Sequence, residues 1–301
     1  MCKEEIIQEV DESQNEITEE ETLEEELEEV EPQQVEPKEI IKKALLIGIN
    51  YTGSDNELYG CINDSENLKD FLIKKKFFKN EELIFMNDNA APDLYPTKAN
   101  IEKQLLDLVK FAEENLDKDI KLFLSYSGHG YYVKDKNGDE KDGHDEVLCP
   151  VDFESGGFIV DDYLKKNFVD KLPENVSIVF LIDSCHSGTM LDLRYNYKDL
   201  KQKYVHELNS ETTCRLVMIS GCRDNETSMD AEIFDDNEER YEYQGAMTAG
   251  FIKKYQKNIT YGELITDMRK YLIKDKFTQV PQLSSGKSID LSQEFILNSY
   301  L

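Results

Sequence analysis

A cysteine and a histidine, each followed closely by glycine, are the residues of this chain best suited to chemistry. His129 lies in 125-SYSGHG-130, and Cys185 lies in 181-LIDSCHSG-188. A cysteine nucleophile needs a nearby base to populate its thiolate, and backbone N–H groups aimed at the developing oxyanion. His129 is the predicted base, and the N–H of Gly130 or Cys185 is a candidate oxyanion donor. The pair predicts covalent catalysis.

Other interpretations of each position stay open. A cysteine at the end of an apolar run is most often core packing, and a lone histidine is most often a satisfied polar group. His186 is a rival base, although adjacent residues rarely direct their side chains at each other. The functional interpretation is favoured by the joint occurrence of two such groups after neighbouring strands.

The elements that must position this pair can be predicted from hydrophobic patterns. Continuous apolar runs indicate strands, and apolar residues at i, i+3 and i+4 indicate helices. Buried strands that alternate with helices predict an α/β fold, with a mostly parallel central sheet and helices on both faces. Ligands in such sheets bind beyond the carboxyl ends of the strands, so His129 and Cys185 are expected in one crevice. The predicted strands are 43–50, 82–87, 120–126, 176–183 and 214–220, and the predicted helices are 62–75, 99–115, 161–168, 244–255 and 260–273.

Charge divides the chain into an acidic N-terminal segment and a globular part. The net charge is -28, and residues 1–40, with 17 acids and two lysines, contribute -15 of it. We expect this segment to be a solvated tail or a loose acidic helix, with a partner-binding helix as the alternative. Residues 188–213 have the pattern of a polar connection, which would divide the globular part into about 41–200 and 213–301. The acidic stretch 135–146 is predicted to be a hairpin loop, because its glycines do not fit an EF-hand.

Composition excludes several classes of function. Because the chain is strongly acidic, it would repel the phosphate backbone of nucleic acids, which are therefore not expected partners. Cationic ligands are the better match. No apolar run is long enough to span a bilayer and no signal peptide is present, which predicts a cytoplasmic protein without membrane contact. Six cysteines without a C-x-x-C pair indicate thiols and not a zinc ribbon or a disulfide framework. A monomer is expected.

Seven motifs follow one another along the globular part of the chain. They are 45-LLIGINY-51, 60-GCIND-64, 124-LSYSGHG-130, 145-DEVLCPVDF-153, 182-IDSCHSG-188, 219-ISGCRDNETS-228 and 245-GAMTAGF-251. In this order they resemble the metacaspases, a family of caspase-like cysteine peptidases. The resemblance covers the chain from about residue 42 to 300, and D-S-C-H-S-G stands where caspases have Q-A-C-x-G. It implies a caspase-like three-layer α/β fold over 41–301, with a large-subunit-like part 41–200, a linker at about 194–212 and a small-subunit-like part 213–301. The short linker resembles the type I arrangement.

The resemblance also implies the reaction. A dyad of Cys185 and His129 would cleave protein or peptide substrates after arginine or lysine, the residue called P1. A cationic P1 side chain needs carboxylates at the floor of its pocket. The pocket residues that the resemblance implies are Cys61, Asp64, Ser127 and Asp183. For two of them another role stays open: Asp64 as a carboxylate at a helix N-terminus, and Asp183 as a cap at a strand end.

Calcium is the cofactor that the resemblance implies, as an activator. Oxygen-rich loop clusters suit a hard divalent cation, although a solvated acidic face is the alternative in a chain with 63 acids. Two rival functions stay open: a calcium-responsive scaffold with little peptidase activity, and a related cysteine peptidase of other P1 preference. The implied metal ligands are Asp145, Asp161, Asp162 and Asp192.

A basic cluster in the predicted connection suggests self-cleavage. The stretch 194-RYNYKDLKQKY-204 carries Arg194, Lys198, Lys201 and Lys203, and an Arg/Lys-specific enzyme would meet these residues first. A helix whose lysines face solvent is the alternative.

Overall fold

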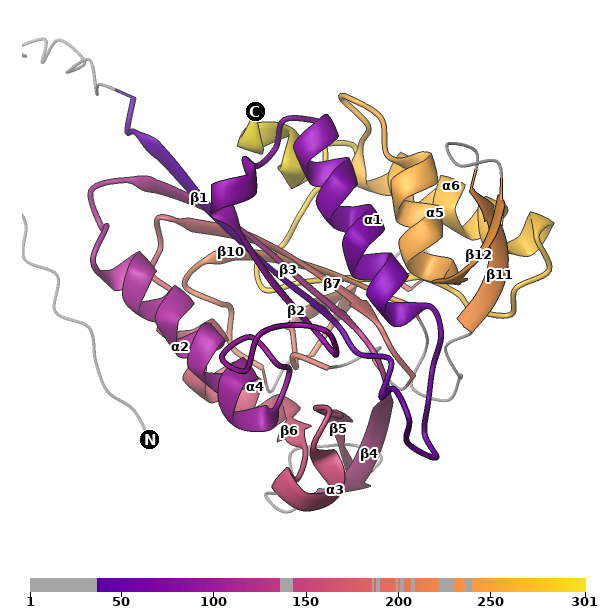
Figure 1. Ribbon diagram of the computed structural model, residues 1–301. Helices are drawn as coiled ribbons and strands as arrows, with labels where there is room; N and C mark the ends of the chain where they lie inside the picture. Colours follow the sequence, from indigo (N-terminus) through magenta and orange to yellow (C-terminus); the bar gives the residue numbers. More distant parts are fainter. Residues whose placement is uncertain are drawn as a thin grey trace, which may run out of the picture. The chain divides into compact units, whose positions relative to one another are not determined.

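Five parallel strands, all predicted from apolar runs, form the centre of an eight-stranded sheet (Figure 1). They are β1 (Ile40–Gly48), β2 (Leu83–Asn87), β3 (Asp119–Ser127), β7 (Val176–Asp183) and β10 (Arg215–Ser220). Three antiparallel strands complete it: β13 (Gln282–Ser285), β8 (Tyr195–Asn196) and β9 (Tyr204–Val205). The strand order is β2-β1-β3-β7-β10-β13-β8-β9.

The structure is a computed structural model of the chain. It describes residues 37–135, 143–185, 187, 190–198, 200, 203–206, 209–221, 230–235 and 240–301. Residues 38–301 form one compact unit. Residues 1–36 of the predicted acidic segment, 1–40, lie outside the described residues.

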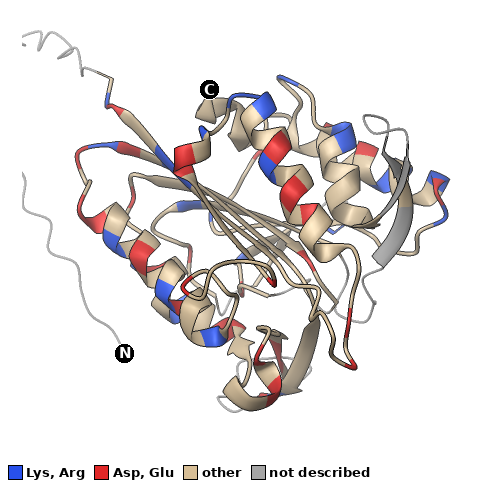
Figure 2. Ribbon diagram, in the orientation of Figure 1, with Lys and Arg blue, Asp and Glu red and all other residues tan. Residues whose placement is uncertain are grey.

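Helices cover both faces of the sheet, as predicted. The helices α1 (Cys61–Lys74), α5 (Ala246–Lys254) and α6 (Tyr261–Lys274) lie on one face, and α2 (Lys98–Glu113) and α4 (Asp161–Asn167) lie on the other (Figure 1). Side chains along β7 alternate between these layers: Phe180 packs in the core with α2 and α4, and Leu181 in the core with α1, α5 and α6. Charged residues lie mainly on helices and loops, and the central strands carry few (Figure 2). The predicted three-layer α/β fold is confirmed.

A small sheet lies just past the carboxyl ends of the central strands. Its strands are β4 (Gly130–Lys134), β5 (His144–Leu148) and β6 (Ile159–Val160), in the order β4-β5-β6. The antiparallel pairing of β4 with β5 confirms the predicted hairpin, whose residues 136–142 lie outside the described residues. The one-turn helix α3 (Phe153–Gly156) follows β5. Three 3-10 helices are η1 (Asn80–Glu82), η2 (Val169–Lys171) and η3 (Ile296–Tyr300).

The stretch predicted to be a polar connection contributes to the sheet. β8 pairs with β13 and β9 pairs with β8, and Tyr195 and Tyr197 are buried. The prediction is wrong for these residues, because the buried tyrosines supply enough apolar surface to pack a short strand between β13 and β9. β11 (Asp230–Asp235) and β12 (Arg240–Gly245) form a hairpin, so the helix predicted from residue 244 begins at Ala246. Within the described part of the chain, no helix is long and apolar enough to cross a membrane.

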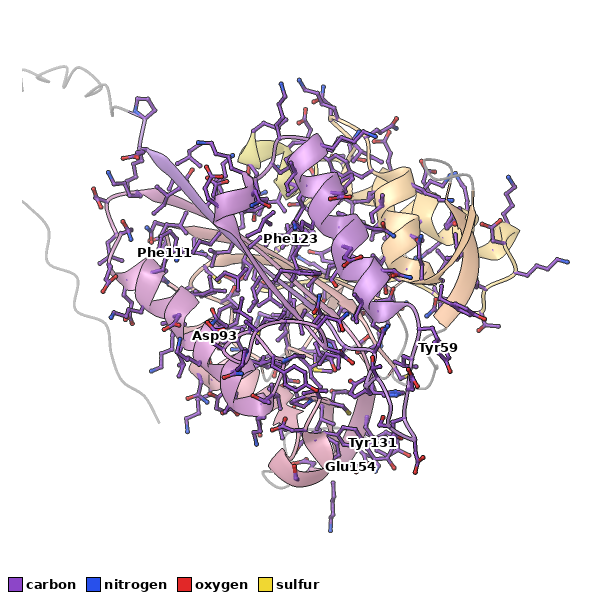
Figure 3. The ribbon with its side chains drawn as sticks, in the orientation of Figure 1. Tyr59, Asp93, Phe111, Phe123, Tyr131 and Glu154 are labelled. Carbon is purple, nitrogen blue, oxygen red and sulfur yellow. The ribbon has the colours of Figure 1, made fainter. Side chains whose placement is uncertain are left out.

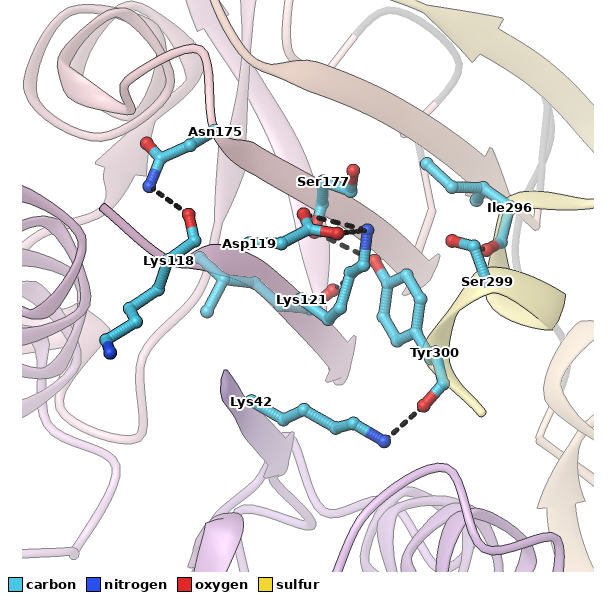
Figure 4. A network of polar contacts seen from close by, with 10 residues as sticks. Lys42, Lys118, Asp119, Lys121, Asn175, Ser177, Ile296, Ser299 and Tyr300 are labelled. Carbon is cyan, nitrogen blue, oxygen red and sulfur yellow. Dashed lines mark hydrogen bonds and ion pairs between the residues drawn. The ribbon is translucent and has the colours of Figure 1, made fainter. Parts of the chain in front are cut away.

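Buried polar groups at the amino ends of the central strands are matched with partners (Figure 4). Lys121 is 6% exposed, and its Nζ lies 3.0 Å from Oδ1 of Asp119. The hydroxyl of Tyr300 lies 2.8 Å from the carbonyl oxygen of Leu122 and 2.9 Å from that of Ser177. These contacts join the last residues of the chain to β3 and β7, so the network holds the C-terminus against the sheet.

Candidate active site

The two predicted catalytic residues follow the carboxyl ends of adjacent parallel strands. Ser127 and Asp183 are register partners, and His129 and Cys185 each lie two residues further along. The carbonyl oxygen of Cys185 lies only 2.1 Å from the place that a β-carbon on Gly130 would occupy. A side chain at that position would collide with backbone, so the glycine lets the histidine loop pack against the cysteine loop. The structure therefore places the loop of His129 beside the loop of Cys185.

The imidazole of His129 is oriented by a backbone carbonyl group. Its Nε2 lies 2.8 Å from the carbonyl oxygen of Asn56. Because a carbonyl oxygen only accepts, Nε2 carries the hydrogen, and Nδ1 is the basic nitrogen of the neutral ring. The side-chain amide of Asn56 donates to Oε1 of Glu154 at 3.1 Å, which ties this loop to α3. Figure 3 labels Glu154 on α3. The role of Asn56 could not be predicted from its residue type, because any residue can supply a backbone carbonyl.

The two predicted pocket carboxylates meet beside Gly245. A β-carbon on Gly245 would lie 2.2 Å from Oδ2 of Asp183 and 2.6 Å from Oδ2 of Asp64. Asp64 accepts from the hydroxyl of Ser127 at 2.5 Å and from the N–H of Gly245 at 2.8 Å. Asp183 accepts from the N–H of Thr248 at 2.9 Å. Asp64, Ser127 and Asp183 are at most 4% exposed, so the carboxylates are buried and their positions are fixed by hydrogen bonds.

The fourth predicted pocket residue, Cys61, lies on the same helix turn as Asp64. It is 7% exposed and begins α1. Its carbonyl oxygen lies 2.3 Å from the place of a β-carbon on Gly48, which is the register partner of Ser127. All four predicted pocket residues therefore gather at the ends of β1, β3 and β7. Asp64 does lie in the first turn of its helix, but its oxygens bond across to β3 and β12.

A second buried thiol lies near the predicted nucleophile. Burial, and to a lesser degree the charge of Cys185, raise the pKa of Cys149 to about 12. Cys149 therefore stays a protonated, unreactive thiol at neutral pH. The position of Cys149 near the predicted nucleophile could not be predicted, because a lone cysteine at the end of an apolar strand has the sequence pattern of ordinary core packing.

The predicted metal ligands are only partly brought together. Burial raises the pKa of Asp161 to about 9, and a side-chain hydrogen bond with Glu146 and the charge of Asp192 add to the rise. Oδ2 of Asp161 accepts from the N–H of Glu146 at 3.0 Å, and Oδ1 accepts from that of Asp162 at 2.8 Å. Asp145 is buried on β5 next to Glu146, a residue that sequence reasoning missed. Among the residues that the structure describes, no group of three or more His, Cys, Asp or Glu side chains could hold a metal ion.

A three-layer α/β sheet with a cysteine and a histidine after adjacent parallel strands defines the class of caspase-like cysteine peptidases. Residues 42–194 match the family model described as metacaspase, peptidase C14 domain. The chain belongs to the metacaspase family of cysteine-type endopeptidases, as the resemblance of its motifs predicted.

The curated relatives are fungal metacaspases. Metacaspase-1A of Neurospora crassa is 37% identical over 306 residues, which cover 85% of this chain and 65% of that protein. Metacaspase-1 of Kluyveromyces lactis is 37% identical, with 85% of this chain and 68% of that protein covered. Metacaspase-1 of Saccharomyces cerevisiae is 37% identical, with 85% and 69% covered. The chain thus spans about two thirds of the length of these relatives.

Solved structures show likeness at the level of the fold. A crystal structure of a protein from Geobacter sulfurreducens is 24% identical, covers 88% of this chain and 100% of its own, and has a TM-score of 0.59. Caspase-1 from Spodoptera frugiperda is 13% identical, with 82% of this chain and 87% of its own covered and a TM-score of 0.47. The first of these likenesses supports the α/β fold.

Proposed function

We propose that this chain cleaves peptide bonds after arginine or lysine, with Cys185 as nucleophile and His129 as general base. The observation that carries the proposal is the meeting of Asp64 and Asp183 beside Gly245, at the strand ends that lead into the two catalytic loops. We thus propose that the pocket for the cationic P1 residue and the dyad lie in the same crevice.

The proposed reaction begins with transfer of the thiol proton of Cys185 to Nδ1 of His129. The thiolate attacks the scissile carbonyl carbon, and the N–H of Gly130 or Cys185 stabilises the oxyanion. The imidazolium then protonates the leaving amine, the peptide bond breaks, and a thioester remains. Water, deprotonated by His129, hydrolyses it. The Asn56 carbonyl supports each step because it accepts from Nε2 and holds the ring in one orientation.

Specificity follows from charge in a buried setting. A guanidinium or ammonium group that reaches Asp64 and Asp183 would pair with both carboxylates in a buried setting, where charge pairs are stronger than in water. An aspartate at P1 would instead meet like charges. The pocket therefore favours arginine or lysine over aspartate, which separates this proposal from a peptidase of other P1 preference.

Fluorogenic peptides that differ only at P1 test this function. We expect peptides with arginine or lysine to be hydrolysed fastest, and those with aspartate slowest. Faster cleavage after aspartate would refute the specificity. Failure to cleave any of the peptides, with Cys185 still open to alkylation, would instead favour the calcium-responsive scaffold.

We further propose that calcium binds the acidic cluster at Asp145, Asp161, Asp162 and Asp192, with Glu146 as an added donor. The pKa of Asp161 is raised first by burial, then by the hydrogen bond with Glu146 and the charge of Asp192, and a dication bound there would offset the crowding of acidic groups. Carboxylate oxygens suit a hard cation, although these side chains must draw closer to form a cage. Bound calcium would order the loop of Asp192, seven residues past the nucleophile. Calorimetric titration with Ca²⁺ should show heat of binding that Asp161→Asn abolishes.

Self-cleavage in the basic stretch after the nucleophile is the last part of the proposal. The guanidinium of Arg194 donates to a backbone carbonyl, and Nζ of Lys203 lies 4.8 Å from the ring centre of Tyr195. Lys198 is exposed, and Lys201 lies outside the described residues. Lys198 is therefore the best-supported site. Mass spectrometry after incubation with calcium should find a boundary there; intact chain during peptide hydrolysis would contradict it. That the enzyme acts as a cytoplasmic monomer stays a prediction from the sequence.

A further inference from the structure

Two tyrosine hydroxyl groups form a buried pair beneath the catalytic histidine. The hydroxyl oxygens of Tyr51 and Tyr126 are 3.2 Å apart, and the two residues are 2% and 1% exposed. Tyr51 lies on the loop after β1, and Tyr126 lies on β3 three residues before His129. Separate parts of the chain thus bring one hydroxyl each to the same point.

The pair binds the backbone of both segments that surround the imidazole. The N–H of His129 donates to the hydroxyl of Tyr51 at 2.9 Å, and the hydroxyl of Tyr126 donates to the His129 carbonyl at 2.8 Å. Tyr51 donates to the carbonyl of Cys149 at 2.6 Å, and the Cys149 N–H donates to Tyr126 at 3.1 Å. The ring of Tyr51 also packs on the imidazole, with 4.7 Å between ring centres. Two hydroxyls therefore bond four backbone groups, and two of these groups, the Cys149 N–H and the His129 carbonyl, also bond each other at 3.1 Å.

The chain accommodates this pair at a conformational cost. Tyr51 has a φ of 54°, in the left-handed region that bulky residues rarely adopt. A β-carbon on Gly128 would lie 2.8 Å from the Tyr126 hydroxyl and 2.9 Å from the Tyr51 hydroxyl, so only glycine fits. Burial raises the pKa of both phenols well above their usual range, so both remain donors at neutral pH. A strained backbone at Tyr51 and a glycine packed closely against both hydroxyls are typical of a functional site.

We infer that Tyr51 and Tyr126 are positioning residues for His129. Their hydroxyls fix the histidine backbone, and the Tyr51 ring fixes the plane of the imidazole. In that orientation Nε2 reaches the Asn56 carbonyl, and Nδ1 is left for Cys185. The inference rests on the proposed function and adds the parts of the chain that hold its base in place.

Removal of each hydroxyl alone tests the inference. Tyr51→Phe and Tyr126→Phe should each lower kcat on an arginine peptide roughly 10-fold to 100-fold, because small errors in the position of a base have large effects on rate. KM should stay within about twofold, since neither residue contacts substrate. Tyr300→Phe is the matched control: it also removes a buried hydroxyl bonded to backbone carbonyls, at the opposite end of the sheet. It should lower the unfolding temperature and leave kcat unchanged.

A second readout does not depend on peptidase activity. The chain has four histidines, so the ring nitrogens of His129 can be followed by ¹⁵N NMR and assigned with His129→Ala. Wild type should show the Nε2–H tautomer, and the two Phe variants a mixture of tautomers. Variants that keep wild-type kcat and wild-type ring shifts overturn the inference. A wild type that shows the single tautomer but hydrolyses no peptide would sink the proposed function and leave the positioning role standing.

Discussion

The two ends of the central sheet handle buried charge in opposite ways. At the amino end, Lys121 lies against Asp119, and Nζ of Lys42 donates to the carbonyl oxygens of Phe77 and Tyr300, so positive groups meet oxygen acceptors (Figure 4). At the carboxyl end, two carboxylates are brought to one point beside Gly245. The first arrangement lowers the free energy of the fold, and the second is costly unless a cation completes it. Two like charges held close together therefore mark the end of the sheet where the site is proposed.

Backbone strain follows the same division. Of the six non-glycine residues with positive φ in the described part of the chain, Lys76 and Lys276 lie just past the ends of α1 and α6, and Asn258 lies between α5 and α6. Tyr51, Asp192 and Leu200 do not follow helices. Tyr51 packs on the proposed catalytic histidine, and Asp192 lies in the loop after the proposed nucleophile. Two of the three residues with this strain thus lie near the proposed site.

The strongest test of this contrast removes chemistry from the carboxyl end. Cys185→Ala and His129→Ala should each lower kcat by at least roughly 10³-fold, because a nucleophile and its base act as a unit. Melting temperatures of both variants should change little. Cys61→Ala should lower kcat less, because that residue is predicted to line the pocket and not to react. Peptide hydrolysis beside thermal melts measures both effects. Substantial turnover in either dyad variant would show that another residue carries the reaction.

The next test removes one of the paired negative charges. Asp64→Asn and Asp183→Asn should each weaken transition-state binding of an arginine peptide by about 2–5 kcal/mol, since a buried cation would lose a partner. The measurement is kcat/KM on arginine and neutral P1 peptides. An equal loss on both peptides would point to misfolding and not to a lost charge pair.

The acidic cluster predicts a pH dependence of stability in metal-free buffer. The folded chain keeps a proton on Asp161 up to a pKa of about 9, whereas the unfolded carboxyl loses it near roughly pH 4. Between these values the unfolded state binds fewer protons, so this group makes stability fall as pH rises, by at most about 1.4 kcal/mol per pH unit. Urea unfolding with a chelator measures the slope. Asp161→Asn should flatten it, and an unchanged slope would contradict the raised pKa.

The smallest effect is expected at the amino end. Lys121→Met keeps the buried stem and removes the charge, which should cost about 1–2 kcal/mol of unfolding free energy because the carboxylate of Asp119 is 38% exposed and can be solvated. Values of kcat should match wild type. Lost activity without lost stability would mean that the two ends are coupled and would break the comparison.

Much of the fold could be predicted because its strands are long and apolar. The run 176–183 is buried on both faces, so a strand could be predicted there and its carboxyl end located. That end places Asp183 at the last residue of the strand and Cys185 two residues beyond it. The short antiparallel strands could not be predicted. β13 has the sequence QLSS and β8 only two residues, and such segments form strands only because a sheet edge is available.

Of the site, the side chains proposed to react could be named from sequence motifs, and the groups that contact them could not. The Asn56 carbonyl has no residue-type signature, and its role depends on a loop fixed by Glu154 about a hundred residues later. Tyr51 ends an apolar run and resembles a core aromatic. Only the fold shows that its hydroxyl reaches the backbone of His129.

The order of the strands decides what a cut in the connection would do to the molecule. β10 and β13 come after the proposed cleavage segment, and they lie between β7 and β8, which come before it. A chain nicked after Lys198 would be interlocked, because strands from one fragment flank those of the other on both sides. The nick would give two bands on a denaturing gel and one particle of unchanged mass by light scattering. Any gain in activity would then come from the freedom of two new chain ends, and not from the release of a fragment.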